Sequence, residues 1–306
     1  MYALKLKPAL KDYLWGGMRL VNEYNIKTDL SKVAEAWVIS THKDGPSVVL
    51  NGEHSGKTLT DAVEAFGPDC LGENGKKFTY FPILVKLIDA KDDLSVQVHP
   101  NDEYALRVEG EYGKTEMWYV VDCEEGATLY YGFKHNITKE EFCSRIKDNT
   151  ITDVLNKVKV KKGDVFFMQA GTIHAIGSGI LIAEIQQNSN TTYRVSDYGR
   201  LGADGKPRPL HIEKAVEVTN LTPPPILKDL PKNTLAECEY FKVKVYNTSD
   251  VKNIVVDNSS FTALLCLDGE VSFDGITLTK GESAFIPANR GEITFSGSAT
   301  IIESRV

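Results

Sequence analysis

Apolar residues along this chain occur mostly in short runs separated by glycine, proline and polar residues, a pattern typical of β-strands. Clear examples are residues 81–88, 116–121, 179–185 and 241–246. In the last of these, Phe-Lys-Val-Lys-Val-Tyr, apolar and charged residues alternate, as expected of a strand with one buried face. The pattern predicts a mainly β protein.

Helical patterns are fewer and shorter. Residues 58–66 end at Gly67, a frequent stop for a helix. The stretch 138–146 opens with Thr-x-x-Glu, the spacing of a capping box. Residues 209–218 predict a further short helix. Its mostly apolar side would consist of Ile212, Ala215, Val216 and Val218.

Prolines indicate where the chain divides. The segments 222–225 and 230–231 contain Pro-Pro-Pro and Leu-Pro, which fit neither a helix interior nor a central strand. We therefore expect a Pro-rich linker at 222–231. It would join an N-terminal domain, 1–221, to a smaller and almost wholly β C-terminal domain, 232–306.

The two domains share a weak internal repeat. Residues 163–171 and 281–289 each have a glycine, an acidic residue, an apolar strand and then a turn residue. Only the first copy is followed by a histidine, His174, because 290–292 contains none. We expect two related β-barrels, of which only the first holds a metal.

A metal site in the first barrel is predicted from four side chains. Alternation along Val-Gln-Val-His places Gln97 and His99 on one face of a strand. With Glu116 and His174 they form a mixed nitrogen and oxygen ligand set, which suits zinc and would also accept iron or manganese. A single strand histidine is more often simply hydrogen-bonded, and the pairing with His174 after the glycine turn favours the metal.

Basic residues near these ligands point to an anionic substrate. Lys114 and Glu116 lie two positions apart on one strand face, and a cation beside a metal ligand is costly unless an anionic group lies nearby. The alternative is a surface lysine. Residues 186–200 are too polar for a core strand and would form either an exposed loop or the lining of a sugar pocket. There Arg194 and Arg200 are candidates for binding a phosphate.

Composition narrows the class of protein. The 306 residues are 42 % apolar and 25 % charged, as in soluble globular proteins. The net charge of −7 argues against a nucleic-acid binder but allows a locally basic pocket. Five scattered cysteines without a CxxC pair suggest reduced core residues, and no apolar run is long enough to cross a membrane. We expect a cytoplasmic monomer.

The motifs resemble a known family. Residues 163–174 are similar to the second cupin motif, with Gln169 where proline is usual. The wider set of motifs resembles type I mannose-6-phosphate isomerases, especially the short form of Gram-positive bacteria, through essentially the whole chain. This set comprises Trp15-Gly-Gly17, Glu35-Ala-Trp37, Gln97-Val-His99-Pro-Asn-Asp102, Gly113-Lys-Thr-Glu116, Gly171-Thr-Ile-His174 and Gln187-Asn-Ser-Asn-Thr-Thr-Tyr-Arg194. The resemblance implies two cupin-like (jelly-roll) β-barrels, the second one degenerate and without metal, with a few short helices.

The resemblance also implies roles for individual residues. His99, Glu116 and His174 match the zinc ligands, and Gln97 matches a further ligand. Arg194 matches the active-site arginine. Lys114 falls where many members carry the lysine of an Asn-His-Lys-Pro-Glu motif, although Gly and Thr replace the histidine and proline here. Residues 133–157 would be a short helical insertion, the remnant of a helical domain in longer members.

By resemblance, the expected activity is a zinc-dependent interconversion of mannose 6-phosphate and fructose 6-phosphate through an enediol, with one zinc ion per chain. The expected partner is this small sugar phosphate, with no nucleic acid and no membrane. Two alternatives remain open at this point. An iron-dependent cupin oxygenase would give Lys114 and Arg194 no clear purpose, and a non-catalytic sugar-binding cupin would tolerate loss of the metal site.

Overall fold

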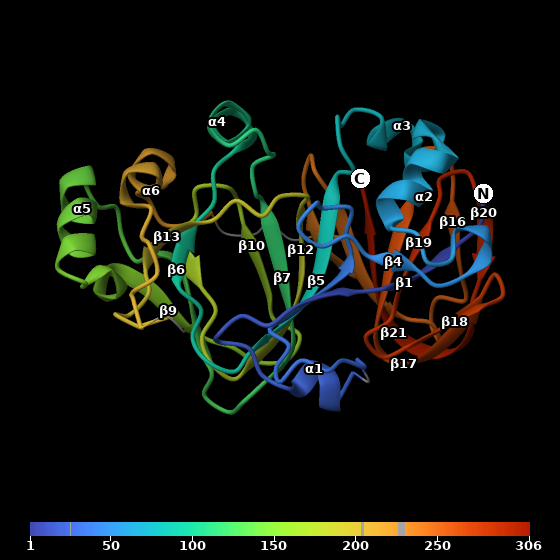
Figure 1. Cartoon of the computed structure of the whole chain (residues 1–306), viewed down its shortest axis with the longest axis horizontal. Helices are drawn as coiled ribbons and strands as arrows, with labels where there is room; N and C mark the ends of the chain where they lie inside the picture. Colours follow the sequence, from blue (N-terminus) through green and yellow to red (C-terminus); the bar gives the residue numbers. More distant parts are fainter. Residues whose placement is uncertain (25, 203–204, 226–229) are drawn as a thin grey trace.

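The computed structural model describes residues 1–24, 26–202, 205–225 and 230–306, which form a mainly β protein of two lobes side by side (Figure 1). Each lobe consists of two β-sheets facing one another, with short helices outside them. The predicted fold class, two jelly-roll-like β units with a few short helices, is confirmed.

The first lobe contains a six-stranded and a five-stranded sheet. The six-stranded sheet has the order β10 (Val165–Met168), β7 (Glu116–Cys123), β12 (Ile180–Gln187), β5 (Ile83–Ala90), β3 (Glu35–Ile39) and β2 (Ala9–Lys11). The five-stranded sheet has the order β13 (Tyr193–Ser196), β6 (Val96–Val98), β11 (His174–Ala175), β8 (Thr128–Phe133) and β9 (Leu155–Lys159). Neighbouring strands come from distant parts of the chain, so the space between the sheets collects residues that are far apart in sequence.

Strand alternation separates two apolar layers in this lobe. On β12, Leu181 and Ala183 pack into the core shared with the second lobe, whereas Ile180 and Ile182 pack between the two sheets. A side chain at the next alternate position, Glu184, is therefore directed into the space between the sheets.

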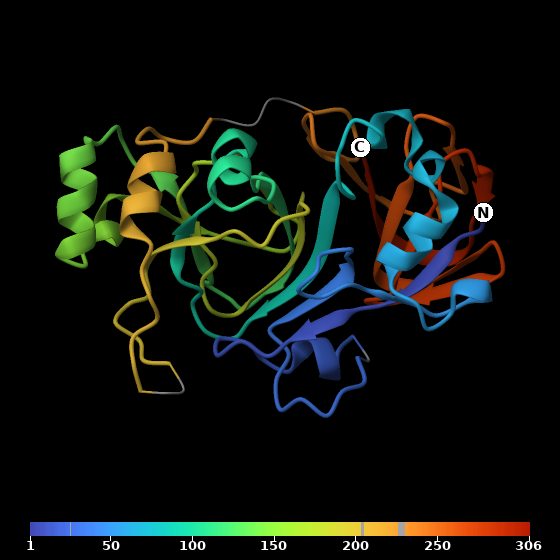
Figure 2. The same ribbon diagram turned by 45° about the horizontal axis from the view of Figure 1, so that its top comes forward.

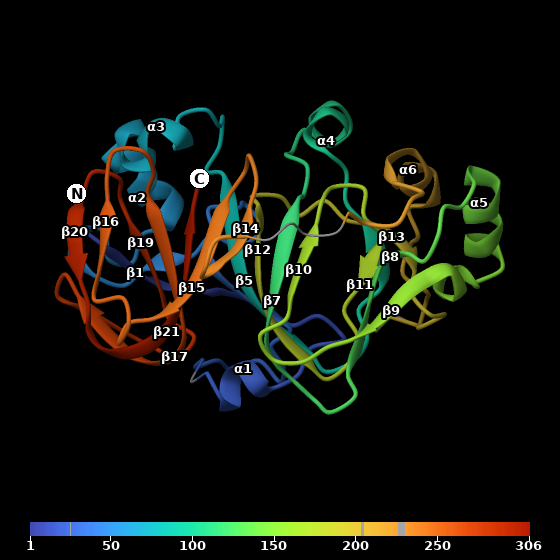
Figure 3. The same ribbon diagram turned by 180° about the vertical axis from the view of Figure 1, so that it is seen from behind.

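The second lobe is built on an eight-stranded sheet backed by a two-stranded one. The large sheet has the order β14 (Thr234–Glu237), β15 (Lys242–Asn247), β21 (Ser296–Arg305), β17 (Thr262–Phe273), β19 (Ser283–Ile286), β1 (Leu4–Lys7) and β4 (Val48–Val49), with β18 (Ile276–Thr279) paired to β17. The small sheet consists of β16 (Asn253–Val256) and β20 (Gly291–Thr294). Figure 3 shows both sheets from behind.

The helices lie on the outside of the lobes. They are α1 (Arg19–Asn22), α2 (Leu59–Phe66), α3 (Gly72–Gly75), α4 (Asp102–Val108), α5 (Lys139–Lys147) and α6 (Ile212–Val218), with 3-10 turns at Gly52–His54, Pro68–Leu71 and Ile151–Val154. Helices α5 and α6 cover the outer face of the five-stranded sheet, while α2 and α3 lie beside the second lobe (Figure 2). No helix of the described residues has the length and apolarity needed to span a membrane.

Most of the predicted elements are present. The expected strands correspond to β5, β7, β12 and β15, and the repeat around Gly163 and Gly281 corresponds to β10 and β19. Thr58 and Thr138 cap α2 and α5 by accepting a hydrogen bond from the backbone three residues on. The capping and alternation patterns succeeded because both are local properties of the chain.

Two expectations need correction. Helix α6 begins at Ile212 rather than at 209, because the backbone just before it bonds to β13: Pro209 O accepts from the Arg194 guanidinium and His211 N donates to Arg194 O. The run 186–200, judged too polar for a core strand, contains the end of β12 and all of β13, in which Tyr193 and Val195 are buried.

The sheets cross the predicted division of the chain. Strands β1 and β4, from the first 50 residues, complete the large sheet of the second lobe through pairing of β1 with β19. The linker at 222–231 stays a prediction, and its residues 226–229 lie outside the described residues. The residues 133–157, expected as a helical insertion, contain α5 and the 3-10 turn Ile151–Val154.

Gly72 connects α3 closely to the second lobe, and we expect its replacement by alanine to destabilise the protein. Its φ of 75° and ψ of 176° are essentially restricted to glycine, and an added Cβ would lie 2.7 Å from the backbone nitrogen of Ser260. Gly67 has nearly the same φ and ψ, 78° and 174°, but its added Cβ would meet nothing within 4 Å. Gly67→Ala is therefore a matched control for backbone strain alone.

The expected loss in the free energy of unfolding is about 1–3 kcal/mol for Gly67→Ala. The loss for Gly72→Ala should be clearly larger, because the backbone clash adds to the strain. Urea denaturation of the two variants measures both. Equal losses would show that α3 does not pack as tightly on the second lobe as described.

Candidate metal centre and active site

Three neighbouring strands bring the predicted ligands together. Gln97 on β6 is paired in register with His174 on β11 and with Arg194 on β13. His99 follows directly after β6, and Glu116 begins β7 in the facing sheet. The two sheets of the first lobe thus contribute ligands from opposite sides.

His99, Glu116 and His174 form a buried cluster. One possible ligand atom from each lies within 4.8 Å of the others, and all three side chains are buried. Among the described residues this is the group of histidine, cysteine and acidic side chains that could hold a metal ion. Gln97 completes the set, with its side-chain amide 3.5 Å from Nε2 of His174.

Both imidazole rings are oriented for metal binding. Nδ1 of His99 lies 2.9 Å from the carbonyl oxygen of Thr191, and Nδ1 of His174 lies 2.8 Å from that of Thr172. Each Nδ1 must carry the hydrogen, so each Nε2 presents its lone pair to the cluster. Burial lowers the pKa of His99 well below its usual value and that of His174 to about 4, so both rings are neutral near pH 7.

Glu116 has a carboxylate oxygen that is suited to contact a cation. Its Oε1 is buried without a hydrogen-bond partner and lies 3.3 Å from Nε2 of His174. Burial, followed by the nearby Glu184 carboxylate, raises the pKa of Glu116 to about 7. An unpaired carboxylate oxygen facing imidazole lone pairs is unfavourable unless a cation lies between them. The donor set of imidazole nitrogen and carboxylate oxygen fits a zinc-like divalent ion.

Lys114 lies against the same ligand atoms. Its ammonium group contacts Glu116 in an ion pair and is 3.2 Å from Nε2 of His99. It is also 3.7 Å from Oε1 of Glu184. The predicted pairing of Lys114 with Glu116 is therefore present. Since the ammonium is itself a cation among these atoms, it shows that the cluster favours positive charge.

Three charged residues beside this cluster were not predicted to belong to the site: Glu35, Lys86 and Glu184. Nζ of Lys86 lies 3.0 Å from Glu184 and 3.7 Å from Glu35, and both interactions are buried. Glu184 also accepts a hydrogen bond of 2.9 Å from the Trp118 ring nitrogen. Despite burial, Lys114 and Lys86 lower the pKa of Glu184 to about 2, and the two carboxylates raise the pKa of Lys86.

A signal for these residues was present in the sequence. Lys86 is the single basic residue of β5, which also contains Asp89, and Glu184 is the single charged residue of β12. The two face each other in register across the strands. A single charge in a fully buried strand requires a partner, and pairing two such strands would have suggested this ion pair.

A cavity of about 290 Å³ opens beside the cluster. Its lining includes Gln97 and Lys114, which contact the metal-ligand group, and Lys86 and Glu184. Arg194 and Arg208 also line it. The cavity therefore has several cationic groups next to a candidate metal site.

The two predicted arginines have different positions. Arg194 lines the cavity, and its Nε is buried without a hydrogen-bond partner, while NH1 donates to Pro209 O at 2.8 Å. Arg200, by contrast, is not among the lining residues, and its guanidinium is bound by Asp197 and the carbonyl of Asp93. The proposed role of Arg200 in binding phosphate is therefore not supported.

Arg208 was not among the candidate residues, but it lines the cavity that Arg200 was expected to line. Its Nε donates to Asp197 at 2.7 Å, and the side chain lines the cavity. His211 was not among the candidate residues, yet its Nδ1 accepts the backbone N–H of Arg194 at 3.1 Å and so supports that strand. Arg208 and His211 lie in the segment before α6. The sequence alone does not show that this segment packs against β13.

Comparison with known proteins agrees with this geometry. Residues 3–126 match the family model of the type I phosphomannose isomerase catalytic domain, and residues 231–306 match that of the mannose-6-phosphate isomerase cupin domain. Mannose-6-phosphate isomerase ManA of Bacillus subtilis (strain 168) is 39 % identical over 99 % of this chain and 98 % of its own length.

Solved structures give the same picture. The crystal structure of mannose 6-phosphate isomerase from Bacillus subtilis superposes with a TM-score of 0.89 at 34 % identity, covering 100 % of both chains. A zinc-bound mannose 6-phosphate isomerase shares the fold, with a TM-score of 0.79 at 19 % identity over 99 % of both chains. With a full-length relative at this level of identity and a matching fold, the chain belongs to the type I mannose-6-phosphate isomerase family of enzymes.

Proposed function

We propose that this protein interconverts mannose 6-phosphate and fructose 6-phosphate through an enediol, with one zinc ion held by His99, Glu116 and His174 and by Gln97 as a further ligand. The observation that carries the proposal is the buried, unpartnered Oε1 of Glu116 facing Nε2 of His174, within a buried cluster that also includes His99 and lies beside a cationic cavity. The names of the relatives support the substrate. We further propose a cytoplasmic location, as composition suggests, and take a monomer as the default state.

The reaction moves a proton between C1 and C2 of the sugar, and negative charge develops on the oxygens at these carbons. Zinc, when bound, would act as a Lewis acid toward these oxygens. The chain supplies fixed positive charge nearby: Lys86 is kept protonated by Glu35 and Glu184, and Lys114 forms ion pairs with Glu116 and Glu184. Such preorganised charges stabilise an enediolate without reorganising during the reaction.

The phosphate end of the substrate requires a different set of donors. Arg194 has a free buried Nε–H, and Arg208 lines the same cavity with its orientation set by Asp197. A guanidinium can bind two phosphate oxygens at once, and a carboxylate behind it holds the fork in place. We assign Arg208 to the phosphate of the substrate. We assign Arg194 either to the reacting C1–C2 end of the sugar or to a second contact with the phosphate.

Replacing Arg208 by alanine should raise KM for mannose 6-phosphate by about tenfold, because one charge-assisted contact to the phosphate is lost. Arg200→Ala is the matched control: Arg200 also pairs with Asp197 but does not line the cavity. Steady-state kinetics of both variants measure the effect. An equal rise in KM for both would mean that the cluster around Asp197 matters only for local folding.

The proposed activity is tested by assaying purified protein with mannose 6-phosphate and detecting fructose 6-phosphate in a coupled reaction, with and without a chelator. Turnover that chelation abolishes and zinc restores would support both the reaction and the metal. Metal-replete protein without turnover would refute the isomerase proposal. Oxygen uptake by the iron-loaded protein would then favour the oxygenase alternative.

A further inference from the structure

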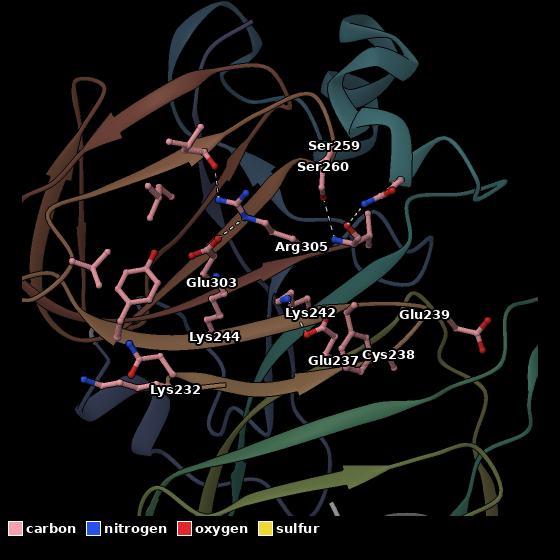
Figure 4. A pocket seen from close by; sticks show the side chains of 18 of the residues that line it. Lys232, Glu237, Cys238, Glu239, Lys242, Lys244, Ser259, Ser260, Glu303 and Arg305 are labelled. Carbon is pink, nitrogen blue, oxygen red and sulfur yellow. Dashed lines mark hydrogen bonds and ion pairs between the residues drawn. The ribbon is translucent and has the colours of Figure 1, made fainter. Parts of the chain in front are cut away.

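A second polar groove lies in the second lobe, away from the metal cluster. It has a volume of about 770 Å³ and runs between the β14–β15–β21 edge of the large sheet and strand β16 (Figure 4). None of the residues that line the cavity beside the metal cluster lines this groove. Its size is in the range that small-molecule sites occupy in proteins.

One wall of the groove is a polar face of β15. Lys242, Lys244 and Tyr246 occupy alternate positions on this strand, and all three line the groove. On the neighbouring β21, Arg305 lies opposite Lys242 and Glu303 lies opposite Lys244. Charged side chains on a strand face need contact with water, an ion-pair partner or a polar ligand.

The charges on this wall are only partly paired. Lys242 forms an ion pair of 2.8 Å with Glu237, and Arg305 pairs with Glu303 (Figure 4). Among the interactions of the described residues, Lys244 has no ion pair although Glu303 is its cross-strand neighbour, because Arg305 takes that carboxylate. Lys232 is likewise unpaired within the described part of the chain, and it precedes Asn233, whose carbonyl accepts from Val245 N at 2.9 Å. Two ammonium groups without an ion pair therefore line the groove, one on β15 and one in the turn before β14.

The floor of the groove holds an unused hydroxyl group. Tyr246 is 7 % exposed, and its hydroxyl lies beside the Glu303 carboxylate without a hydrogen bond of good geometry. Burial and the neighbouring Glu303 carboxylate raise the pKa of this hydroxyl, so it stays protonated and can donate. A buried polar group without a partner costs free energy, which a ligand with a suitable acceptor would recover.

The groove is also locally basic in an acidic protein. Its lining has five basic side chains, Lys77, Lys232, Lys242, Lys244 and Arg305, against three acidic ones, Glu237, Glu239 and Glu303. The chain as a whole carries a net charge of −7. A concentration of positive charge within a concave surface attracts anions and raises their local concentration.

We propose that this groove is a second ligand site, which takes a phosphate monoester of a small polyhydroxylated molecule. Lys244 and Lys232 bind the phosphate, and Tyr246 with the flanking polar side chains binds the hydroxyl groups. Binding here does not require the proposed isomerase activity, since none of these residues belongs to the metal cluster or its cavity.

The test is a calorimetric titration of the metal-replete protein with glucitol 6-phosphate, an open-chain phosphate that cannot be isomerised. We expect two binding equivalents per chain for the unchanged protein. Lys244→Ala combined with Tyr246→Phe should weaken one equivalent by about tenfold or more and leave mannose 6-phosphate turnover at low substrate unaltered. Lys252→Ala is the matched control, because Lys252 is exposed and lies between two groove residues without lining the groove.

Further measurements separate the second site from the first. Arg194→Ala should weaken only the other equivalent. Glucitol without phosphate should bind the groove weakly, and added salt should reduce the affinity of glucitol 6-phosphate there. A single equivalent that Arg194→Ala abolishes and Lys244→Ala with Tyr246→Phe does not change would overturn the proposal. Equal loss of affinity in Lys252→Ala would overturn it as well, since the effect would then reflect overall charge.

Discussion

Replacement of His174 by alanine should release the metal and lower turnover of mannose 6-phosphate by about a thousandfold or more. His174 supplies one of three clustered ligand atoms, and the remaining pair, His99 and Glu116, would hold a divalent ion far less tightly. Lewis-acid stabilisation of the reacting oxygens contributes several kcal/mol, and each 1.36 kcal/mol corresponds to tenfold in rate. Metal content by elemental analysis and kcat by the coupled assay measure the two effects together.

The matched control is His135→Ala, which removes an exposed histidine far from the ligand set in sequence. This variant should retain full metal content and turnover. To separate metal loss from misfolding, we would compare the thermal unfolding midpoints of the His174→Ala variant and of the unchanged protein, both without metal. If His174→Ala keeps stoichiometric metal and normal turnover, the assignment of the metal site is wrong.

Replacement of Arg194 by alanine should lower turnover by about a hundredfold while the metal stays bound. Arg194 is paired in register with Gln97 and lines the cavity, but it contributes no ligand atom to the cluster. A positioned guanidinium that interacts with charge on the substrate is worth a few kcal/mol, because the site around it is fixed in advance. Kinetics and metal analysis of the same sample give the result.

Arg194→Lys separates charge from geometry. Lysine keeps the positive charge but lacks the planar fork, so it should recover only part of the lost turnover. Metal loss in Arg194→Ala would show that this residue supports the ligand strands rather than the substrate. The structural contact that alanine removes is the hydrogen bond from NH1 of Arg194 to the carbonyl of Pro209, whereas the backbone bonds to His211 remain.

The strands and helices were largely predictable from the sequence because their patterns are local. Alternation marked β15, Gly67 marked the end of α2, and the capping pattern at Thr138 marked the start of α5. No strand was predicted at β13, because its polar residues suggested a loop or the lining of a pocket. Pairing with β6 and packing against the helices α5 and α6 outweigh that local composition, so the strand forms regardless.

The candidate metal ligands were predictable in identity but not in arrangement. Histidine and glutamate at these positions, together with the family resemblance, pointed to His99, Glu116 and His174, which the fold does bring together. The surrounding charges were not found. Lys86 and Glu184 come from segments almost a hundred residues apart, and only the register of β5 with β12 places them face to face.

The sequence by itself therefore determined the class of elements, the chemical type of the ligand atoms and the family resemblance. The tertiary structure decided which arginine, Arg208 rather than Arg200, lines the cavity, and it joined β1 and β4 to the sheet of the second lobe. The physical reason is that side-chain type and periodicity are encoded locally. Strand pairing, by contrast, depends on which distant apolar faces can be buried together, and that is settled only when the whole chain packs.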